Sequence, residues 1–483
     1  MKKIIDIYIN MSKQVKASFW FLICIFLQKS VSIITTPIFT RIMNTEEYGS
    51  FVAFNSWLSI ISVFVTFNIF AGVFEQGIIK YYDDKNTFYS SLQYLTLSMT
   101  IIWTFIYILF KDFWNNIFKL DTTQMLLMIV IIWLSAVFQF WSVLQRTEYE
   151  YKKLVIVTLF ASIIEPLVSI VLVVKMKNKV TARIIGTALS HVICYLFLFI
   201  LQIRKNKKTS INKYWSYSLR LSAPLIPHYL SQTMLNSADK IVIKNICGSS
   251  SAAKYSLVSL ISSTMVIFSS ALLQTLTPWI YQKIKARSVN EISKICYFSL
   301  MFIAILNILL MIVAPELVLI FAPNDYYEAI YIIPPLSMSV YFMFTYDLFA
   351  KFEFYYEKTK YISFATVFCA ILNLSLNTIL VGKYGYKISG YITLLCYILY
   401  SLFHFLIQDN IVKKNFENKK VYQFKIICLI SIVFMIFGFI ILLLYDHVFI
   451  RYILLFIIVI MIIKEKSKLK KIIADFLKIK IVN

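Results

Sequence analysis

The chain has 483 residues, of which 60% are hydrophobic and only 15% are charged. Soluble domains usually contain about a quarter charged residues, and the mean hydropathy here is +0.75. No single soluble core could bury that much apolar surface, so the composition excludes a soluble enzyme and indicates a polytopic, all-α membrane protein.

The formal net charge of +24 would fit a nucleic-acid-binding protein, but the placement of the charges argues against one. Most of the 48 Lys and Arg residues fall in the N-terminus, the C-terminus and alternate loops. This is the positive-inside distribution, which predicts that both termini are cytoplasmic. The first apolar run is too long for a signal-peptide core, so we expect it to be retained as a span.

Apolar windows of about 20 residues, long enough to cross a bilayer, recur almost from end to end. We expect about 14 spans, near residues 17–41, 48–72, 88–110, 123–145, 153–175, 180–203, 216–242, 252–280, 293–315, 328–350, 360–381, 387–408, 423–445 and 447–464. An even number agrees with two cytoplasmic ends. The stretch 73–87 has a mixed face and is expected to lie at the cytoplasmic membrane surface.

A basic loop divides the chain into two sets of six spans. We expect an N-terminal lobe at 1–203, a basic cytoplasmic linker at 204–215, a C-terminal lobe at 216–410, and two extra helices with a basic tail at 411–483. The segments 44–49 (NTEEYG) and 248–255 (GSSSAAKY) echo each other weakly in the two halves. Paired halves around a midplane site are a common transporter plan.

Five of the predicted spans carry polar stripes at helical spacing. The stripes are Lys29, Ser32, Thr36 and Thr40; Thr158, Ser162, Glu165 and Ser169; Arg183, Thr187, Ser190 and His191; His228, Gln232, Asn236 and Lys240; and Tyr341, Thr345, Asp347 and Lys351. A charge at bilayer depth costs roughly 2.5–3.5 kcal/mol, so such groups face the protein interior or water. The stripes therefore predict a water-filled cavity with cations (Lys29, Arg183, Lys240) and titratable acids (Glu165, Asp239, Asp347).

Structural interpretations of the same stripes remain open. Ser and Thr stripes often serve only helix–helix packing, and Arg183, Asp239 and Lys240 lie near span ends, where side chains reach the interface. An ion pair between Lys29 and Glu165 is the best structural alternative to a functional role for these two residues. His191 and His228 fit packing roles, and His404 and His447 carry no pattern.

Several kinds of chemistry have no counterpart in the sequence. It contains no phosphate-binding glycine loop, nucleotide signature, metal-ligand cluster or nucleophile elbow, so we expect no cofactor, no metal and no enzymatic activity. The seven cysteines are scattered and form no CxxC pair, which predicts no disulfide framework. With no ATPase motif, transport would have to be driven by an ion gradient, a substrate gradient or consumption of the product.

Several ordered segments resemble bacterial polysaccharide-repeat flippases (Wzx-type) of the multidrug/oligosaccharidyl-lipid/polysaccharide exporter superfamily. The similar segments are 36–41 (TPIFTR), 44–49 (NTEEYG), 223–228 (APLIPH), 237–243 (SADKIVI), 314–316 (APE), 326–334 (YYEAIYIIP) and 373–377 (NLSLN), followed by Gly385 and Thr393. The last motif departs from the family's Gly-x-x-Gly-Ala-Ala turn, because Ile388 stands at its second glycine.

The resemblance implies two six-helix lobes in a V shape around a central cavity. It implies an undecaprenyl-diphosphate-linked oligosaccharide as substrate, moved to the outer leaflet of the bacterial inner membrane for O-antigen or capsule synthesis by alternating access. Expected partners are H+ or Na+, membrane lipids, and polysaccharide polymerase and chain-length machinery. The candidate substrate-binding residues are Lys29, Arg41, Arg183, Gln232, Asn236 and Lys240, and the ion-coupling candidates are Glu165, Asp239 and Asp347.

Two alternative functions stay open from the sequence. A repeat-unit polymerase or ligase would act on the same lipid-linked sugars, but such enzymes resemble one another in having a large basic extracytoplasmic loop, and the predicted loops here are short. A drug or cation exporter of the same superfamily would favour an acidic, aromatic cavity, whereas these stripes mix both signs of charge.

Overall fold

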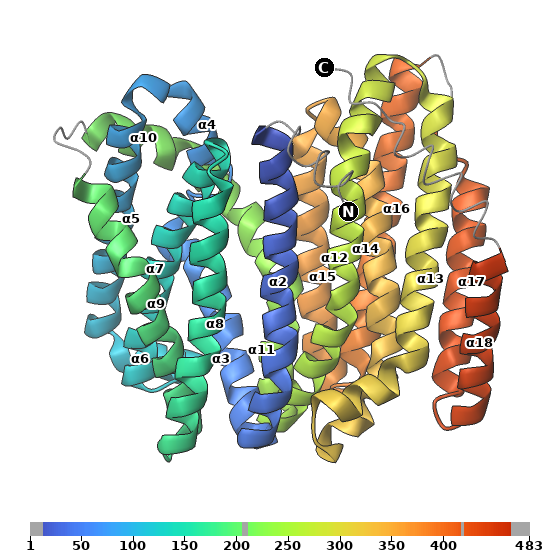
Figure 1. Ribbon diagram of the computed structural model, residues 1–483, viewed down its shortest axis with the longest axis horizontal. Coiled ribbons are helices and arrows are strands. Elements are labelled where there is room, and N and C mark those ends of the chain that lie inside the picture. Colours follow the sequence, from blue (N-terminus) through green and yellow to red (C-terminus); the bar gives the residue numbers. More distant parts are fainter. Residues whose placement is uncertain (1–12, 205–210, 417–419, 465–483) are drawn as a thin grey trace, which may run out of the picture. The chain divides into compact units, whose positions relative to one another are not determined.

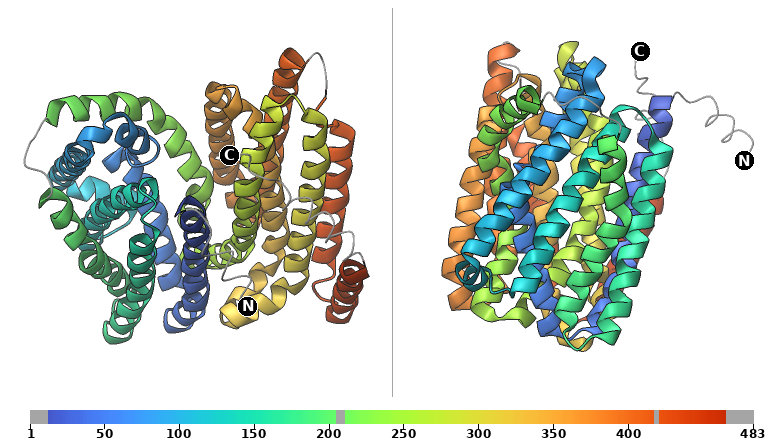
Figure 2. Two further views of the ribbon diagram at one scale, coloured as in Figure 1. Left: turned by 45° about the horizontal axis from the view of Figure 1, so that its top comes forward. Right: turned by 90° about the vertical axis from the view of Figure 1, so that its left-hand side faces the viewer.

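The computed structural model describes residues 13–204, 211–416 and 420–464, and every regular element in these ranges is helical. The helices fall into two compact units, Met1–Ala253 and Lys254–Asn483. Figure 1 labels the helices, and Figure 2 gives two further views. The expected all-α membrane architecture is confirmed.

In its described residues the first unit contains twelve helical elements and the first turn of a thirteenth. They are α2 (Lys13–Ile42), α3 (Thr45–Thr66), α4 (Val73–Lys80), η1 (Tyr82–Asp84), α5 (Lys85–Leu109), α6 (Lys111–Phe118), α7 (Thr122–Thr147), α8 (Tyr151–Lys175), α9 (Lys179–Arg204), α10 (Ile211–Ser222), η2 (Ala223–Leu225) and α11 (Ile226–Cys247). Helix α9 packs along both α7 and α8, α2 lies against α8, and α3 lies against α11.

The second unit is built from the remaining elements. They are α12 (Ser249–Lys285), whose first turn belongs to the first unit, α13 (Val289–Phe321), η3 (Asn324–Ile332), α14 (Ile333–Tyr355), α15 (Thr359–Tyr384), α16 (Ile388–Asn415), α17 (Phe424–Leu443) and α18 (Val448–Lys464). Helix α14 packs along α16 and is the most enclosed of the spans, while α17 and α18 lie against α13 (Figure 1).

Helix starts follow from local capping chemistry. The Asn44 side chain accepts a hydrogen bond from the Glu47 backbone N–H at 2.8 Å, and the Glu47 carboxylate accepts one from the Asn44 backbone N–H at 2.8 Å. Asp121 and Gln124 form the same reciprocal box at the start of α7. Each box satisfies two backbone donors that the first helical turn leaves free.

The expected number of 14 spans is not confirmed. Twelve of the described helices are long and apolar enough to cross a membrane by length and composition. The expected seventh span, 216–242, is the clearest difference, because Pro224 and Pro227 separate α10 from α11 and the long helix begins at Ile226. Its polar residues also keep α11 below the apolarity of a typical span. The last expected span, α18, is a shorter apolar helix.

The boundary between the compact units also lies later than the division expected from the basic loop. Part of that loop, 205–210, lies outside the described residues, as does most of the tail, 465–483. Residues 211–222 form α10, which packs on α4 and α5. Helix α11 groups with the first unit because it packs along α3, and 411–415 continue α16.

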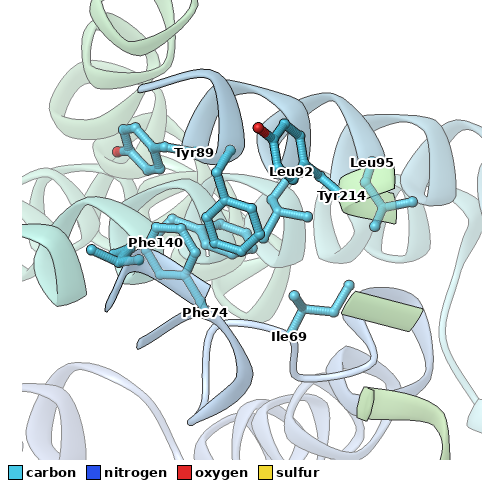
Figure 3. Packing of buried hydrophobic residues seen from close by; sticks show 9 residues of the cluster. Ile69, Phe74, Tyr89, Leu92, Leu95, Phe140 and Tyr214 are labelled. Atoms are coloured by element: carbon cyan, nitrogen blue, oxygen red, sulfur yellow. The ribbon is translucent and has the colours of Figure 1, made fainter. Parts of the chain in front are cut away.

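An aromatic cluster fastens α4 and α10 across one end of the first unit (Figures 1 and 3). The ring of Phe74 lies 4.8 Å from that of Phe140, edge to face, and 5.8 Å from that of Phe88, stacked. Tyr214 of α10 is buried against Phe88 and donates a hydrogen bond to Asp84 at 3.1 Å. Burial and the Asp84 contact raise the pKa of Tyr214. This cluster holds the segment 73–87 against α7 and α10.

Candidate functional site

Helix α11 presents a continuous polar face. Because α11 runs unbroken from Ile226 to Cys247, His228, Gln232, Asn236 and Lys240 lie one above another, four residues apart. Gln232 and Asn236 are exposed, and the other two are half-buried. The Lys240 ammonium donates to the Asn236 carbonyl oxygen at 3.2 Å. The predicted stripe therefore forms a real surface of hydrogen-bonding groups.

The opposite face of α11 is buried and includes Leu235, Ala238 and Asp239. The Asp239 carboxylate accepts a hydrogen bond from the backbone N–H of Lys240 at 2.8 Å. Asp239 and Lys240 thus diverge, one into the protein and one along the polar face. The pair does not act as one charged group on a single surface.

Close packing against α3 holds α11 in this orientation. A Cβ on Gly49 would overlap the carbonyl oxygen of Ser249, so only glycine lets α3 approach the start of α12, which directly follows α11, this closely. The Ser50 hydroxyl donates to the Ser249 hydroxyl at 3.1 Å beside this contact. The two segments whose sequences echo each other, 44–49 and 248–255, therefore meet at this contact between α3 and the start of α12.

The polar stripe predicted on α2 splits into two environments. Lys29 and Ser32 are exposed, whereas Thr36 and Thr40 are buried, and the Thr36 hydroxyl donates to the Ser32 carbonyl oxygen at 2.8 Å. Among the described residues, none forms an ion pair or hydrogen bond with the Lys29 ammonium. Its exposure in the middle of an apolar helix requires a polar environment at that depth, because an ammonium in hydrocarbon is costly.

Glu165 makes its contacts with α9. Its carboxylate accepts a hydrogen bond from the Thr187 hydroxyl at 3.3 Å. The Thr187 carbonyl oxygen lies 2.8 Å from Nδ1 of His191, and Glu165 is close enough to His191 to interact with it electrostatically. Within the described residues no lysine or arginine forms an ion pair with Glu165, so the structural alternative of a Lys29–Glu165 pair is wrong for this conformation.

Arg183 lies one turn before Thr187 in an aromatic cage. Its guanidinium carbon is 3.8 Å from the ring centroids of both Phe39 and Phe51, and 5.1 Å from that of Tyr48. Cation–π contacts of this kind contribute about 0.5–2 kcal/mol each. Arg183 therefore joins α9 to α2 and α3, which is a structural contact that the sequence left open.

Arg41 is exposed at the end of α2. It donates to the Pro37 carbonyl oxygen at 2.9 Å, one helical turn before it. The side chain thus lies along its own helix.

A hollow in the first unit was not anticipated from the sequence. It has a volume of about 380 Å³ and is lined by Gln76 of α4, Arg220 of α10 and Tyr229 of α11, among others. The Tyr229 hydroxyl donates to the Ala71 carbonyl oxygen at 2.7 Å, which fixes one wall. Sequence reasoning could not anticipate this hollow, because α4 and α10 are about 130 residues apart in the chain and come together only in the folded protein.

In the second unit, Asp347 and Lys351 of α14 form an ion pair at 3.4 Å. They are separated by one helical turn, and the Asp347 side chain is about a third exposed, at 31%. The predicted stripe on this helix is therefore partly an internal salt bridge. Tyr341, on the same helix, contacts the Ser431 hydroxyl of α17 at 3.1 Å.

A fully buried acid and a fully buried imidazole of the second unit did not stand out in the sequence. Glu353 of α14 and His404 of α16 are fully buried, and Oε1 of the acid lies 2.6 Å from Nδ1 of the imidazole. A repeat of Tyr397, Tyr400, His404 and Gln408 along α16 carries the helical period that could have identified this face. Elsewhere in the described chain, no three His, Cys, Asp or Glu side chains gather to form a metal site.

Two protein-family models match overlapping parts of the chain. A family model described as "Polysaccharide biosynthesis protein" matches residues 15–284, more than half of the chain, and the MatE model matches residues 224–379.

Two curated proteins of Haemophilus influenzae are similar to parts of the chain. "Lsg locus putative protein 1" is 27% identical over 208 residues, which cover 40% of this chain and 50% of that protein. An "Uncharacterized membrane protein" is 23% identical over 253 residues, covering 50% of this chain and 62% of that protein. The chain thus aligns with about half to three fifths of each relative's length.

Solved structures share the fold over most of the chain. The lipid II flippase MurJ, in an inward closed conformation, superposes with a TM-score of 0.71 at 17% identity, covering 92% of this chain and 99% of that one. An inward-facing multidrug resistance MATE family transporter of the MOP superfamily superposes with a TM-score of 0.65 at 13% identity, covering 81% and 96%. At these identities the likeness establishes the fold.

Proposed function

The chain belongs to the polysaccharide biosynthesis protein family, and on that premise we propose that it is a flippase for undecaprenyl-diphosphate-linked oligosaccharide repeat units. It moves them from the cytoplasmic to the outer leaflet of the bacterial inner membrane, where they enter O-antigen or capsule synthesis. Both chain ends lie in the cytoplasm, as the distribution of lysine and arginine predicts. The fold shared with MurJ supports the proposal, since that protein is a flippase of lipid II.

The observation that carries the proposal is the exposed polar face of α11. Gln232 and Asn236 offer amide donors and acceptors that suit sugar hydroxyls. Lys240 on the same face, and Lys29 on α2, supply ammonium groups for the diphosphate. The polyprenyl tail can stay in lipid while the polar head passes along these groups, so the protein has to provide a polar path only for the head.

The remaining predicted residues take supporting roles in this proposal. Arg41 extends the cationic surface at the end of α2, and Arg183 keeps the ends of α2, α3 and α9 together through its aromatic cage. Glu165, Asp239 and Asp347 are the candidates for carrying a coupling H+ or Na+. Arg220 and Gln76, in the hollow near the start of α11, add a further place for an anionic headgroup.

The test is the leaflet distribution of polyprenyl-diphosphate-linked sugars in a strain that lacks the gene. We expect complete repeat units trapped in the cytoplasmic leaflet. Repeat units that reach the outer leaflet but stay unpolymerised would instead identify a polymerase or ligase. If the amounts and leaflet distribution of the lipid-linked sugars are unchanged, the protein is neither the flippase nor the polymerase or ligase.

Complementation of that strain tests the α11 face directly. Asn236→Leu removes an exposed amide from the polar face and is expected to leave repeat units trapped. Asn245→Leu makes the same chemical change near the end of the same helix, where Asn245 is exposed beyond the predicted span, and is expected to restore export. Equal behaviour of the two variants at equal protein levels would contradict a substrate role for this face.

Lys29 offers a second matched comparison. Lys29→Met removes the charge and is expected to abolish complementation, whereas Lys29→Arg keeps a cation and is expected to retain part of it. Lys175→Met, at the exposed end of α8, is the control for loss of a lysine in general.

A drug or cation exporter is the second candidate, and the MatE match over residues 224–379 favours it. The cations exposed on the first unit argue against a cationic cargo, because like charges repel. Export of a cationic dye by the purified protein in liposomes, with no movement of lipid-linked sugar, would establish this alternative.

A further inference from the structure

A buried acid–imidazole pair joins the two most tightly packed helices of the second unit. Glu353 of α14 and His404 of α16 are both 0% exposed, and their nearest side-chain atoms are 2.6 Å apart. Neither residue belongs to the polar faces discussed for the substrate. Buried ionisable groups in membrane helices are costly and usually have a function.

Each member of the pair keeps one polar atom without a partner. Within the described part of the chain, no hydrogen-bonding group contacts Oε2 of Glu353, Nε2 of His404 or Oε1 of Gln408, one turn further along α16. Buried polar atoms are normally paired, so three such atoms in one place require an explanation. Oε2 and Nε2 are also the two positions at which the pair could gain or lose a proton.

The charge of the pair depends on how many protons it holds. With one proton shared between Oε1 and Nδ1, it is neutral overall, either as carboxylate with imidazolium or as carboxylic acid with imidazole. A second proton leaves a net positive charge, and loss of the first leaves a net negative one. Both charged states are strongly disfavoured in a closed, dry site. The number of bound protons can therefore change only when α14 and α16 admit water.

Within the described residues, no lysine or arginine forms an ion pair with Glu353. Lys351 is bound to Asp347, and Lys413 to Asp409 further along α16. The titratable and charged groups on the helices packed around the pair include Tyr341, Tyr346, Asp347 and Lys351 of α14, Tyr397, Tyr400, Cys396, Asp409, Lys413 and Lys414 of α16, Cys369 of α15, Cys296, Tyr297 and Glu316 of α13, Cys428 and Lys425 of α17, and Tyr422 just before α17.

Aromatic hydroxyl groups and one partly exposed acid connect the pair with its surroundings. The His404 ring lies 4.5 Å from the Tyr400 ring and 5.5 Å from the Tyr346 ring, centroid to centroid. The Tyr400 hydroxyl is 2.9 Å from the Thr366 hydroxyl of α15. Asp347, which is partly exposed, interacts electrostatically with His404. A proton therefore has polar groups on its way from the surface of α14 to the buried imidazole.

We propose that Glu353 and His404 form a proton-binding site of the second unit, which exchanges one proton each time α14 and α16 open to water during transport. The inference rests on the proposed flippase function and names its coupling ion as H+. When the site is hydrated, a hydronium ion transfers its proton to Oε2 of Glu353 and leaves as water. When the site is hydrated from the other side, the same oxygen returns the proton to water. Because proton number and helix separation change together, the proton gradient can drive the conformational cycle.

The first test observes the imidazole without any substrate. The chain contains four histidines, so nitrogen-15 NMR of the histidine-labelled protein in lipid nanodiscs gives few signals, and His404→Gln identifies the one from His404. We expect this signal to change with pH, and Glu353→Gln to alter the pH at which it changes. Asp409→Asn, which removes a carboxylate from the same helix, is expected to leave it unaltered. A His404 signal that is constant across the stable pH range would overturn the proposal.

The second test measures coupling. Proteoliposomes loaded with lipid-linked sugars extracted from the source membranes are assayed for flipping with and without an imposed pH gradient. We expect the gradient to accelerate flipping by the native protein and by the Asp409→Asn variant. In Glu353→Gln and His404→Gln, we expect the gradient to have no effect on the flipping rate. Glutamine at 353 can still hydrogen-bond His404, so the fold should survive.

The outcomes separate the two levels of inference. If Glu353→Gln lowers thermal stability but keeps the full response to the gradient, the pair only fastens α14 to α16 and the proposal fails. If the native protein flips no lipid-linked sugar at all, the proposed function fails, while the NMR titration still decides whether the pair exchanges a proton.

Discussion

Replacing Glu316 by leucine is expected to destabilise the second unit strongly, because it leaves a buried guanidinium without its anion. Arg451 of α18 is 1% exposed and forms two parallel hydrogen bonds with the Glu316 carboxylate of α13, at 2.8 and 3.0 Å. It also donates to the Ile312 carbonyl oxygen at 2.6 Å. Such two-pronged contacts are the strongest class of side-chain ion pair.

The two halves of the pair are buried to different extents, and this sets the expected magnitudes. Removing one partner of a buried pair costs about 3–5 kcal/mol, because the other charge is left uncompensated. That range applies to Glu316→Leu, because the variant leaves the buried Arg451 guanidinium without an anionic partner. The Glu316 side chain is 32% exposed, so Arg451→Met leaves a carboxylate that water can reach. We expect it to cost about 1.5–3 kcal/mol, the value of a hydrogen bond to a charged group.

Reversible unfolding of the four proteins in mixed micelles gives the full double-mutant cycle. The double variant is expected to lose less stability than the two single variants added together, since neither unpaired charge remains. Additivity within about 0.5 kcal/mol is the behaviour of independent sites. Additive losses, or Arg451→Met being the costlier change, would refute the argument that the buried arginine dominates.

Three further predictions concern the first unit. Gly49→Ala should separate α3 from the start of α12, because the new methyl group overlaps the carbonyl oxygen of Ser249. A cysteine cross-link across that contact should form in the native protein and fail in the variant, and unchanged cross-linking would contradict the close approach. The hydrogen bond and charge of Lys13, 2.7 Å away, lower the pKa of Glu150. The contact should therefore persist above the ordinary pKa range of a glutamate and be lost as pH falls through the lowered value. A spin label in the first turn of α2 should become more mobile over that pH interval, and Glu150→Gln should remove this change in mobility. Glu165→Gln should weaken the response of flipping to an imposed ion gradient, and a fully retained response would exclude Glu165 as the coupling residue.

The sequence predicted most spans because each is an apolar run of the length that a bilayer requires. The prediction was wrong where a second rule competed with hydrophobicity. Pro224 and Pro227 end one helix and begin another inside a single apolar window, so α11 starts at Ile226 instead of 216. Such a proline boundary can be recognised in the sequence, but hydropathy averaged over a window of about 20 residues does not reveal it.

The polar stripe of α11 could be predicted as one face of a helix, whereas the contacts of the stripes with other helices could not. Helical spacing placed His228, Gln232, Asn236 and Lys240 on one side of α11, because that depends only on the helix being unbroken. The spacing could not say which residue on another helix each side chain meets. Lys29 and Glu165 have no ion pair between them, and the partners of Glu165 lie on α9.

The charged residues selected by depth in a span were also not the most enclosed ones. Glu353 lies three residues beyond the expected end of the tenth span, and a lone histidine in an apolar run is usually a packing residue, so neither stood out. Burial in a helical bundle depends on how many neighbours surround a helix, and α14 is surrounded along nearly its whole length. A residue near the end of such a helix can be drier than one at the middle of α2, where few residues are buried and Lys29 is exposed. For this fold, the enclosure of the helix therefore predicts where a proton can be held away from water better than depth along the sequence does.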